Sequence, residues 1–467
     1  MNFLDENGLR RLWAQIILKL NSKVPDGGTT GQVLKKTETG TEWADASFKP
    51  EGKSYLTFSS PNSFTLKVND NTKHWNGTLE YFSSNRTWTT WDGTTTLSAV
   101  ADDGEYVLYL RGTGNTVITG DSSNYRWILT GSDISCTGNI ENLLNYATVE
   151  SGAHPTMANY CYFGMFTNCT SLTQAPALPA TTLADGCYYS MFQNCTNLTQ
   201  APALPATTLA NYCYRNMFQG CTSLTQAPAL PATTLATNCY AGMFYNCTSL
   251  TQAPALPATT LAEGCYSYMF SDCTNLTQAP ALPATTLAQD CYTYMFYNCT
   301  SLTQAPALPA TTLADYCYYG MFNGCTSLTQ APALPATMLA NHCYRGMFNR
   351  CTSLIKAPSE LPATTLAENC YRFMFEFTAI TSIPRIMATT YATDSCKGMF
   401  DDIKTLNVYS SSGEGHTYGW IAPASTYCSV MFGSDDGESE WAKLDGSNFP
   451  NGGTPIEGVT YYFATVD

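Results

Sequence analysis

Cysteine is the residue type in this sequence with the most obvious chemistry, because its side chain can form disulfides or bind zinc. The chain has 467 residues and 20 cysteines. Eight cysteine pairs recur every 26 residues, from Cys161 and Cys169 to Cys343 and Cys351, and the members of each pair are eight residues apart. On a helix this spacing is about 12 Å, which is too far for a disulfide. The pairs also lack the close C-x-x-C spacing of structural zinc sites, and the sequence has only four histidines.

Disulfides between neighbouring repeats are a second possibility, because equivalent residues of stacked strands lie about 5 Å apart. Their Cβ vectors would run parallel, which does not suit a disulfide. The last repeats replace the paired cysteines by Ser395 and Ile403, and by Thr378 or Phe377, and positions that accept such residues are packing positions. We therefore expect unbridged, buried thiols that act as small hydrophobic side chains, with partial disulfides as the alternative.

Catalytic patterns are the next candidates. The sequence has no G-x-S-x-G nucleophile elbow, and G-x-G pairs such as Gly112 and Gly114 lack the third glycine of a phosphate-binding loop. Adjacent carboxylates such as Asp102 and Asp103 suit calcium chemically, but EF-hand spacing is absent and a solvated loop is the better interpretation. We expect no enzymatic activity, no cofactor and no metal. The alternative is an enzyme whose site is hidden in residues 48–131, a predicted β-domain, or in the C-terminal residues 408–467.

The 26-residue period predicts the elements that carry the cysteines. A unit of this length cannot bury its apolar face alone and must stack on its neighbours, as in a solenoid. In the copy that starts at Cys187, the spacing of Leu198, Ala201 and Ala203 is typical of an inward-facing strand, which prolines make short and imperfect. A stripe of apolar residues four apart predicts a helix that packs back on these strands: Leu183, Cys187, Met191 and Cys195.

The run MFxxCTSLTQAPALPATTLAxxCYxxMF resembles the BspA-like leucine-rich repeats of gut and oral bacteria and their phages. The resemblance covers roughly residues 136–407. It implies a curved solenoid that acts as an adhesion or recognition surface and has no catalytic activity.

The composition narrows the possible partners. A formal net charge of -14 argues against nucleic acid, because phosphate binding needs clustered lysines and arginines. No stretch approaches the roughly 18 apolar residues of a membrane span, so we expect no membrane insertion. The first residues, MNFLDENGLRRLWAQIILKL, lack the basic start and continuous apolar core of a signal peptide. We expect the chain to be made and folded in a cytoplasm.

Residues 1–21 predict a short helix with an apolar stripe that includes Leu9, Leu12, Ile16 and Leu20. Such a helix needs a partner, which is another domain of this chain or copies of itself in a coiled bundle. Residues 22–47 have no periodic apolar face and predict an extended linker. Within it, GTTGQVLKKTETGTEWAD resembles segments near the start of phage tail-fibre and related virion proteins. This resemblance favours a phage structural protein over a secreted adhesin.

Residues 48–131 alternate with a period of two and predict a small β-sandwich, in which we expect the tryptophans to pack in the core; a sugar-binding platform built from them is the alternative. Residues 132–160 are expected to cap the start of the solenoid, residues 161–407 to form it, and residues 408–467 to form a C-terminal cap or tip. The fold class is thus α+β and multidomain. A leucine-rich-repeat solenoid of 26-residue repeats follows a short N-terminal helix and a small β-sandwich.

Six positions of each repeat vary while the rest stay nearly fixed, as at Asp185, Gly186, Tyr189, Ser190, Gln193 and Asn194. They hold mostly tyrosine, asparagine, serine and glycine with a few arginines, a mixture typical of paratopes. We therefore predict a diversified binding face, against the alternatives of drift on a solvated face and of binding through the strand face or the tip. The candidate binding residues are Phe163, Tyr189, Arg215, Tyr245, Tyr268, Tyr294, Tyr297, Tyr319 and Arg345.

Together these features favour a non-enzymatic recognition protein. The leading hypothesis is a phage tail-associated protein, part of the virion, that binds a protein or glycan of the host cell surface. Its N-terminus would contact other virion proteins and form a homo-oligomer, which by analogy with tail fibres is expected to be a trimer. The alternatives are an adhesin of the BspA-like type on a bacterial cell surface and a passive structural spacer.

Overall fold

The computed structural model describes residues 32–37, 40–45, 48–52, 55–433, 442–449 and 451–464. The helix predicted for residues 1–21 lies outside them. Within the segment expected to be an extended linker, strands β1 (Gln32–Thr37) and β2 (Gly40–Asp45) pair antiparallel as a hairpin, and the assignment of residues 22–47 as a linker between domains stays a prediction. The regular structure of the described residues is mostly strand, with two short α-helices, α2 (Asn142–Glu150) and α3 (Ser425–Cys428). Neither is long enough to cross a membrane.

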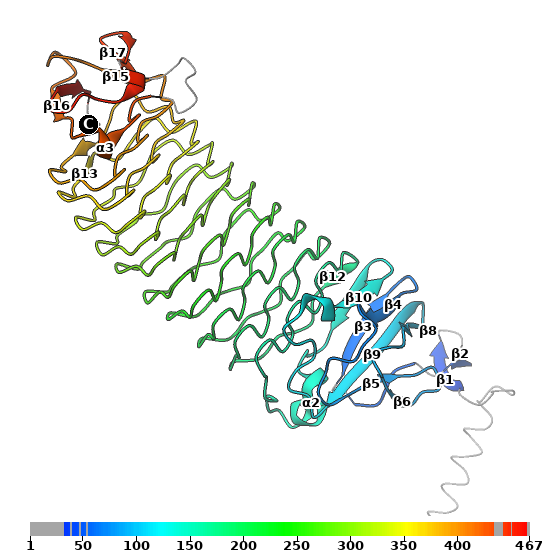
Figure 1. Ribbon diagram of the computed structural model, residues 1–467. Helices are drawn as coiled ribbons and strands as arrows, with labels where there is room; N and C mark the ends of the chain where they lie inside the picture. Colours follow the sequence, from blue (N-terminus) through cyan, green and yellow to red (C-terminus); the bar gives the residue numbers. More distant parts are fainter. Residues whose placement is uncertain are drawn as a thin grey trace, which may run out of the picture.

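The N-terminal strands form two sheets (Figure 1). Their bounds are β3 (Leu56–Ser60), β4 (Thr65–Val68), β5 (Thr78–Phe82), β6 (Trp88–Thr90), β7 (Leu97–Ser98), β8 (Val100–Asp102), β9 (Glu105–Thr113), β10 (Trp127–Thr130), β11 (Ile134–Thr137) and β12 (Leu172–Gln174). The smaller sheet has the order β10-β4-β7; the larger has the order β12-β11-β3-β9-β5-β6, with β8 beside β9. Neither sheet closes into a barrel. The small sandwich expected here stays a prediction.

The core of this region is aromatic, as the sequence predicts. Trp75, Trp91 and Trp127 are buried, and the Trp91 ring lies 5.0 Å from Trp75 and 5.5 Å from Trp127 between ring centroids. These three side chains therefore pack in the core and offer no surface to a sugar. Trp88 is partly exposed, but the Arg111 guanidinium already lies 4.1 Å from its ring centroid.

The larger sheet leads directly into the repeats, because β11 pairs in parallel with β12 of the first repeat. The short 3-10 helix η1 (Ser123–Tyr125) precedes β10. The N–H of Trp127, the first residue of β10, donates to the carbonyl of Met165, and the N–H of Ile118 donates to that of Cys161. The first repeat is thus covered by residues 118–140, through hydrogen bonds of the same kind as those that join one repeat to the next.

The apolar stripe of each repeat does not form the predicted α-helix, and that prediction is wrong. In the copy that starts at Cys187, every second N–H bonds within the chain across a tight turn: the N–H of Met191 donates to the carbonyl of Tyr188 at 3.2 Å. The alternate N–H groups bond to the next repeat, as from Phe192 to the carbonyl of Met217 at 3.0 Å. We call this element, residues 185–195 and its equivalents, the turn ribbon. An α-helix cannot form here because half of its N–H groups serve the neighbouring repeat.

The turn ribbon has a period of four residues. Gly186, Ser190 and Asn194 have φ angles of 61°, 53° and 58°, in the left-handed region, and their equivalents do so in every one of the eight repeats. Between them, pairs such as Cys187 with Tyr188 and Met191 with Phe192 point into the core and are at most 1% exposed. The ribbon therefore buries two residues of every four and turns the other two toward its outer side.

The core of the repeats consists of columns of equivalent side chains. Nine tyrosines from Tyr162 to Tyr371 form one column, and phenylalanines from Phe166 to Phe432 form another. Neighbouring rings are nearly parallel, as for Phe192 and Phe218 with centroids 5.7 Å apart and an angle of 5°. Because equivalent rings of successive repeats stack on one another, the distance between neighbouring repeats is nearly constant, and the repeats form an elongated stack of coils (Figure 1).

The strands of the repeats are short, as predicted. Apart from β12, the described repeats contain only β13 (Glu360–Leu361) and β14 (Arg385–Ile386), and elsewhere isolated parallel bridges such as Gln200 with Gln226 and Thr234 with Thr260. The stacking continues beyond residue 407, since the N–H of Phe400 donates to the carbonyl of Met431 and the Phe432 ring stacks on Phe400.

The remaining C-terminal elements close the far end of the stack (Figure 1). They are β15 (Asn407–Val408), β16 (Tyr418–Ile421), α3, β17 (Lys443–Leu444), β18 (Ser447–Asn448), the short 3-10 helix η2 (Asn451–Gly453) and β19 (Thr460–Phe463). β15 pairs with β17, which pairs with β18, and β16 pairs with β19. Phe463 and Phe449 pack on Phe432, which ends the phenylalanine column.

Candidate binding face

The six variable positions of each repeat lie on the outer side of the turn ribbon, because the fixed residues between them fill the core; most of the variable residues are at least partly exposed, but small ones such as Ser190, Ser271 and Thr293 are buried. We call this outer side the variable face. Half of its positions, those equivalent to Gly186, Ser190 and Asn194, have a positive φ in all eight repeats. Glycine and asparagine adopt this conformation most readily. Part of the paratope-like composition therefore has a backbone cause, which corrects the reasoning from composition alone.

Five tyrosines occupy left-handed positions, against that preference: Tyr160, Tyr212, Tyr268, Tyr294 and Tyr316 have φ between 51° and 58°. Elsewhere in the eight repeats the same columns hold mostly glycine or asparagine, as at Gly242 and Asn216, with Ser190, Asp290 and His342 as the exceptions. A bulky side chain in this conformation costs about 1–2 kcal/mol. Strained residues of this kind concentrate at functional sites. Tyr160, Tyr212 and Tyr316 are absent from the sequence-based candidates, although they occupy variable positions and that signal could have found them.

Eight of the nine candidate residues, all except Tyr245, fall into two groups of contacting side chains. In the first, the Phe163 and Tyr189 rings meet edge to face at 4.9 Å, and the Arg215 guanidinium lies 5.6 Å from the Tyr189 ring centroid. In the second, Tyr294 stacks on Tyr268 at 5.2 Å and contacts Tyr319 at 4.8 Å.

The second group extends further through its neighbours. Tyr297 meets Tyr294 edge to face at 5.4 Å, and the Arg345 guanidinium lies 5.5 Å from the Tyr319 centroid. Tyr316 also joins the group, with its ring 5.9 Å from Tyr319, and it stacks on His342 at 4.5 Å. Tyr245 belongs to neither set of ring contacts, but burial and then the Asp272 carboxylate raise its pKa.

Tyr268 and Tyr294, both in the second group, stay protonated at neutral pH. Burial, with the Asp290 carboxylate among the smaller causes, raises the pKa of Tyr268. Burial and then a hydrogen bond with Tyr319 raise the pKa of Tyr294. Burial, with Arg345 second, lowers the pKa of His342, so its imidazole is neutral at pH 7.

Two hollows open side by side on the variable face and share Asn238, Ser267 and Tyr268. The larger, about 400 Å³, is also lined by Glu263, Gly264, Asp290, Thr293, Tyr316 and Tyr319. The smaller, about 240 Å³, is also lined by Arg215, Asn216, Gln219, Ala241, Gly242 and Tyr245. We call them the tyrosine hollow and the arginine hollow.

The hollows exist because one column of the variable face carries small side chains in the middle of the stack. That column reads Phe163, Tyr189, Arg215, Ala241, Ser267, Thr293, Tyr319 and Arg345 along the eight repeats. Three small residues in succession, between large ones on either side, leave an unfilled space about three repeats long. The hollows thus follow from the side chains that differ between repeats and not from the shared fold.

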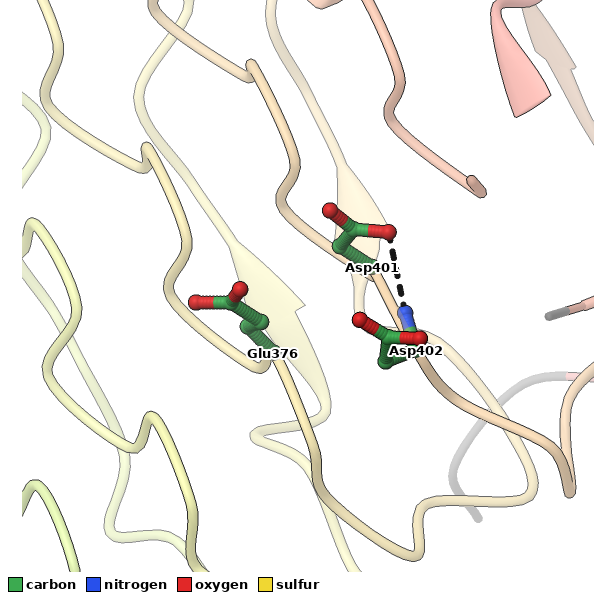
Figure 2. Close-up of side chains that lie close together, drawn as sticks. All are labelled: Glu376, Asp401 and Asp402. Atoms are coloured by element: carbon green, nitrogen blue, oxygen red, sulfur yellow. Dashed lines mark hydrogen bonds between the residues drawn. The ribbon is translucent and has the colours of Figure 1, made fainter. Parts of the chain in front are cut away.

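The described residues also contain one group of carboxylates that suits a cation. Glu376 lies on one coil and Asp401 and Asp402 on the next, with an oxygen from each within 4.8 Å of the others (Figure 2). Asp401 is fully buried and accepts a hydrogen bond from the N–H of Asp402 at 3.0 Å, and Glu376 accepts one from the amide of Asn349. Oxygen ligands are those that calcium prefers. Acidic groups of this kind are common without a metal, so no role is assigned to this one.

All 20 cysteines are free and buried, which confirms the expectation of unbridged thiols. In the second cysteine column the thiol donates to a carbonyl of the preceding repeat, as from Cys221 to Phe192 at 3.1 Å. Ser395 takes a cysteine position and is fully buried, as expected of a packing position. Burial raises the pKa of the Cys221 and Cys273 thiols to about 12. Such thiols neither bind metal nor react at neutral pH.

Comparison with known proteins identifies the repeats. A family described as BspA type leucine rich repeat region (6 copies) matches residues 145–277, 185–329 and 237–374. The chain thus contains BspA-type leucine-rich repeats. No curated protein and no solved structure matches the chain. No comparison supports the resemblance of the N-terminal segment to tail-fibre proteins, which stays a hypothesis.

Proposed function

We propose that residues 145–374, the BspA-type leucine-rich repeats, form a solenoid whose variable face binds a protein or glycan on a cell surface, without catalysis. The observation that carries this proposal is the set of five tyrosines in left-handed positions, because each is strained where glycine or asparagine would not be. Tyrosine supplies large contact area at low entropic cost, which suits recognition.

Two settings follow for such a protein. BspA-type repeats are typical of surface proteins, which supports an adhesin on a bacterial cell surface. The segment GTTGQVLKKTETGTEWAD motivates the other setting, a phage tail protein that attaches the virion to its host and contacts other virion proteins through its N-terminus as a homo-oligomer. In both settings the same face of the repeats makes the contact.

The test replaces Tyr245, Tyr268, Tyr294 and Tyr297 together with asparagine, which tolerates the left-handed conformation of two of these positions. Binding of the purified chain is measured on immobilised mucin and on a glycan array, after melting curves have shown an unchanged fold. We expect binding to fall at least tenfold.

A matched control changes four exposed residues on another side of the coil to serine: Thr234, Thr260, Thr286 and Thr312. It should bind as the unchanged chain does. Full binding by the tyrosine variant, or an equal loss in the threonine variant, would place recognition elsewhere, on the strand face or at the C-terminal tip. A chain that binds no surface at all would favour a passive spacer.

A further inference from the structure

We infer that the tyrosine hollow binds an organic cation, a ligand that carries a primary or quaternary ammonium group. The inference rests on the proposed function, since it names the ligand class for part of the same face. It depends on three features of the hollow: the charge of its walls, the arrangement of its rings and its position among the repeats.

The charge of the walls is negative. Glu263 and Asp290 line the hollow, and no lysine, arginine or histidine is among its lining residues. The Gln289 amide donates a hydrogen bond to the Asp290 carboxylate at 3.2 Å, and the Thr293 hydroxyl, also 3.2 Å from that carboxylate, lies closer to the Tyr316 carbonyl, to which it donates at 2.7 Å; both groups are neutral. Glu263 is exposed at the rim. A cation entering the hollow would therefore meet two carboxylates without displacing a basic side chain from its walls.

The rings of the hollow suit the same ligand. Tyr268, Tyr316 and Tyr319 line it, and the face of an aromatic ring attracts a cation within about 6 Å of its centroid. The Arg345 guanidinium, 5.5 Å from the Tyr319 centroid, already makes such a contact from outside the hollow. An ammonium group bordered by aromatic rings and carboxylates is a recurring recognition geometry for quaternary ammonium ligands.

The rings are also held in place before any ligand arrives. Tyr268 stacks on Tyr294 with an angle of 25° between the rings, and Tyr294 in turn contacts Tyr319. Tyr316 is fixed between Tyr319 and His342. Tyr268 is 42% exposed, so one part of its ring is free for a ligand while the other part packs. Preorganised rings lose little entropy on binding.

The ligand could carry either a quaternary or a primary ammonium group, and the experiment distinguishes the two. Calorimetry on the full chain at constant ionic strength measures choline, which has a quaternary ammonium, and Nα-acetyl-lysine amide, which has a primary one. The neutral isostere 3,3-dimethylbutan-1-ol is measured beside them. We expect at least one cation to bind at millimolar concentration or below, at least tenfold more tightly than the isostere.

Variants test whether binding occurs in this hollow. Removing both charges with Glu263→Gln and Asp290→Asn should weaken cation binding at least tenfold, and Tyr319→Ala should do the same by removing a wall. The control Glu360→Gln removes an exposed carboxylate from strand β13, outside the hollow, and should leave the affinity unchanged.

Equal affinity for choline and its neutral isostere, or no binding of either cation, would overturn the inference. Cation binding that survives the double charge removal would also overturn it. A different result would refute the proposed function: full binding to mucin and to the glycan array by the variant in which Tyr245, Tyr268, Tyr294 and Tyr297 are asparagine. Binding of a neutral oligosaccharide that Tyr319→Ala abolishes, without any cation binding, would keep the proposed function and refute the cation.

Discussion

Raising the pH above 9 should unfold the repeats cooperatively, because the core is lined with thiols that cannot ionise in place. Burial is the largest cause of a raised pKa at every one of the 20 cysteines, from an ordinary value of 9.0 to about 12 at Cys169, Cys221 and Cys317 and higher at others. A group with a raised pKa holds its proton more tightly in the folded chain. Its contribution to stability is therefore complete below pH 9 and is lost as the pH rises toward the folded pKa.

The size of the effect follows from the number of thiols. Each pH unit above the unfolded pKa removes about 1.4 kcal/mol per thiol from the free energy of unfolding. Each 26-residue repeat has two thiols, so at pH 10 it loses about 2.8 kcal/mol, compared with a stability of about 1.3–4 kcal/mol at roughly 0.05–0.15 kcal/mol per residue. We therefore expect a midpoint between about pH 9.5 and pH 10.5.

Circular dichroism and tryptophan fluorescence, followed during a pH titration with a phosphine reductant present, measure this transition. A variant in which Cys195, Cys221, Cys247 and Cys273 are threonine, the residue that the chain has at Thr378, serves as the control. It has fewer buried ionisable groups, so its midpoint should move to higher pH. Retention of the folded signal above about pH 11 in the unchanged chain would refute the reasoning.

Three further predictions concern the thiols, the tyrosine hollow and the N-terminal domain. Iodoacetamide at pH 8 should label no cysteine of the native chain and all 20 after denaturation, as read by mass spectrometry; disulfide-linked peptides from neighbouring repeats would contradict this. Tyr268→Asn should change the free energy of unfolding by less than about 1 kcal/mol, because asparagine removes the strain of a tyrosine at positive φ and this gain offsets the lost contact with Tyr294. Phe270→Ala, in the core, should lower the free energy of unfolding by about 3–5 kcal/mol. Urea titrations measure both changes. Gly112→Ala should destabilise the N-terminal sheets by about 3 kcal/mol, since a Cβ there would overlap the Leu143 carbonyl. Gly104→Ala should destabilise them by only about 1 kcal/mol, because the space around Gly104 is open. Equal melting temperatures for the two variants would contradict this prediction.

The assembly prediction concerns residues outside those described. If the apolar stripe of residues 1–21 is a self-association seam, the full chain should be oligomeric and a chain without these residues should be a folded monomer. Light scattering measures the oligomeric state of the two chains. If the full chain is a monomer, residues 1–21 dock on another domain of their own chain.

Several properties of the repeats could be predicted from the sequence because they depend only on spacing and on residue type. The period of 26 residues requires stacking, and the substitution of cysteine by Ser395 and Ile403 indicates a packing column. The outward position of the variable residues follows in the same way, since the fixed apolar residues between them must face the core. Tyr189 and Gln193 are partly exposed and Phe192 is buried, as that argument requires.

The turn ribbon could not be predicted by matching apolar residues to a helix. The apolar stripe consists of residues four apart, Leu183, Cys187, Met191 and Cys195. Over a short distance, both an α-helix and a chain of four-residue turns place residues with this spacing on one face. An α-helix advances about 100° per residue, so a strict four-residue stripe drifts by roughly 120° over three such steps. The frequent occurrence of glycine, asparagine and aspartate at every fourth position indicates left-handed turns, which an α-helix does not contain.

The tyrosine hollow depended on the tertiary structure alone. Tyr268 and Tyr316 are 48 residues apart and in repeats that do not adjoin, so no local pattern relates them. They line one hollow because the stacking sets equivalent positions of successive repeats side by side, and because Ser267 and Thr293 are too small to fill the space between them. The sequence alone determined which side chains each coil presents. Only the hydrogen bonds from one repeat to the next decided which of those side chains meet, because they set the register in which the coils stack.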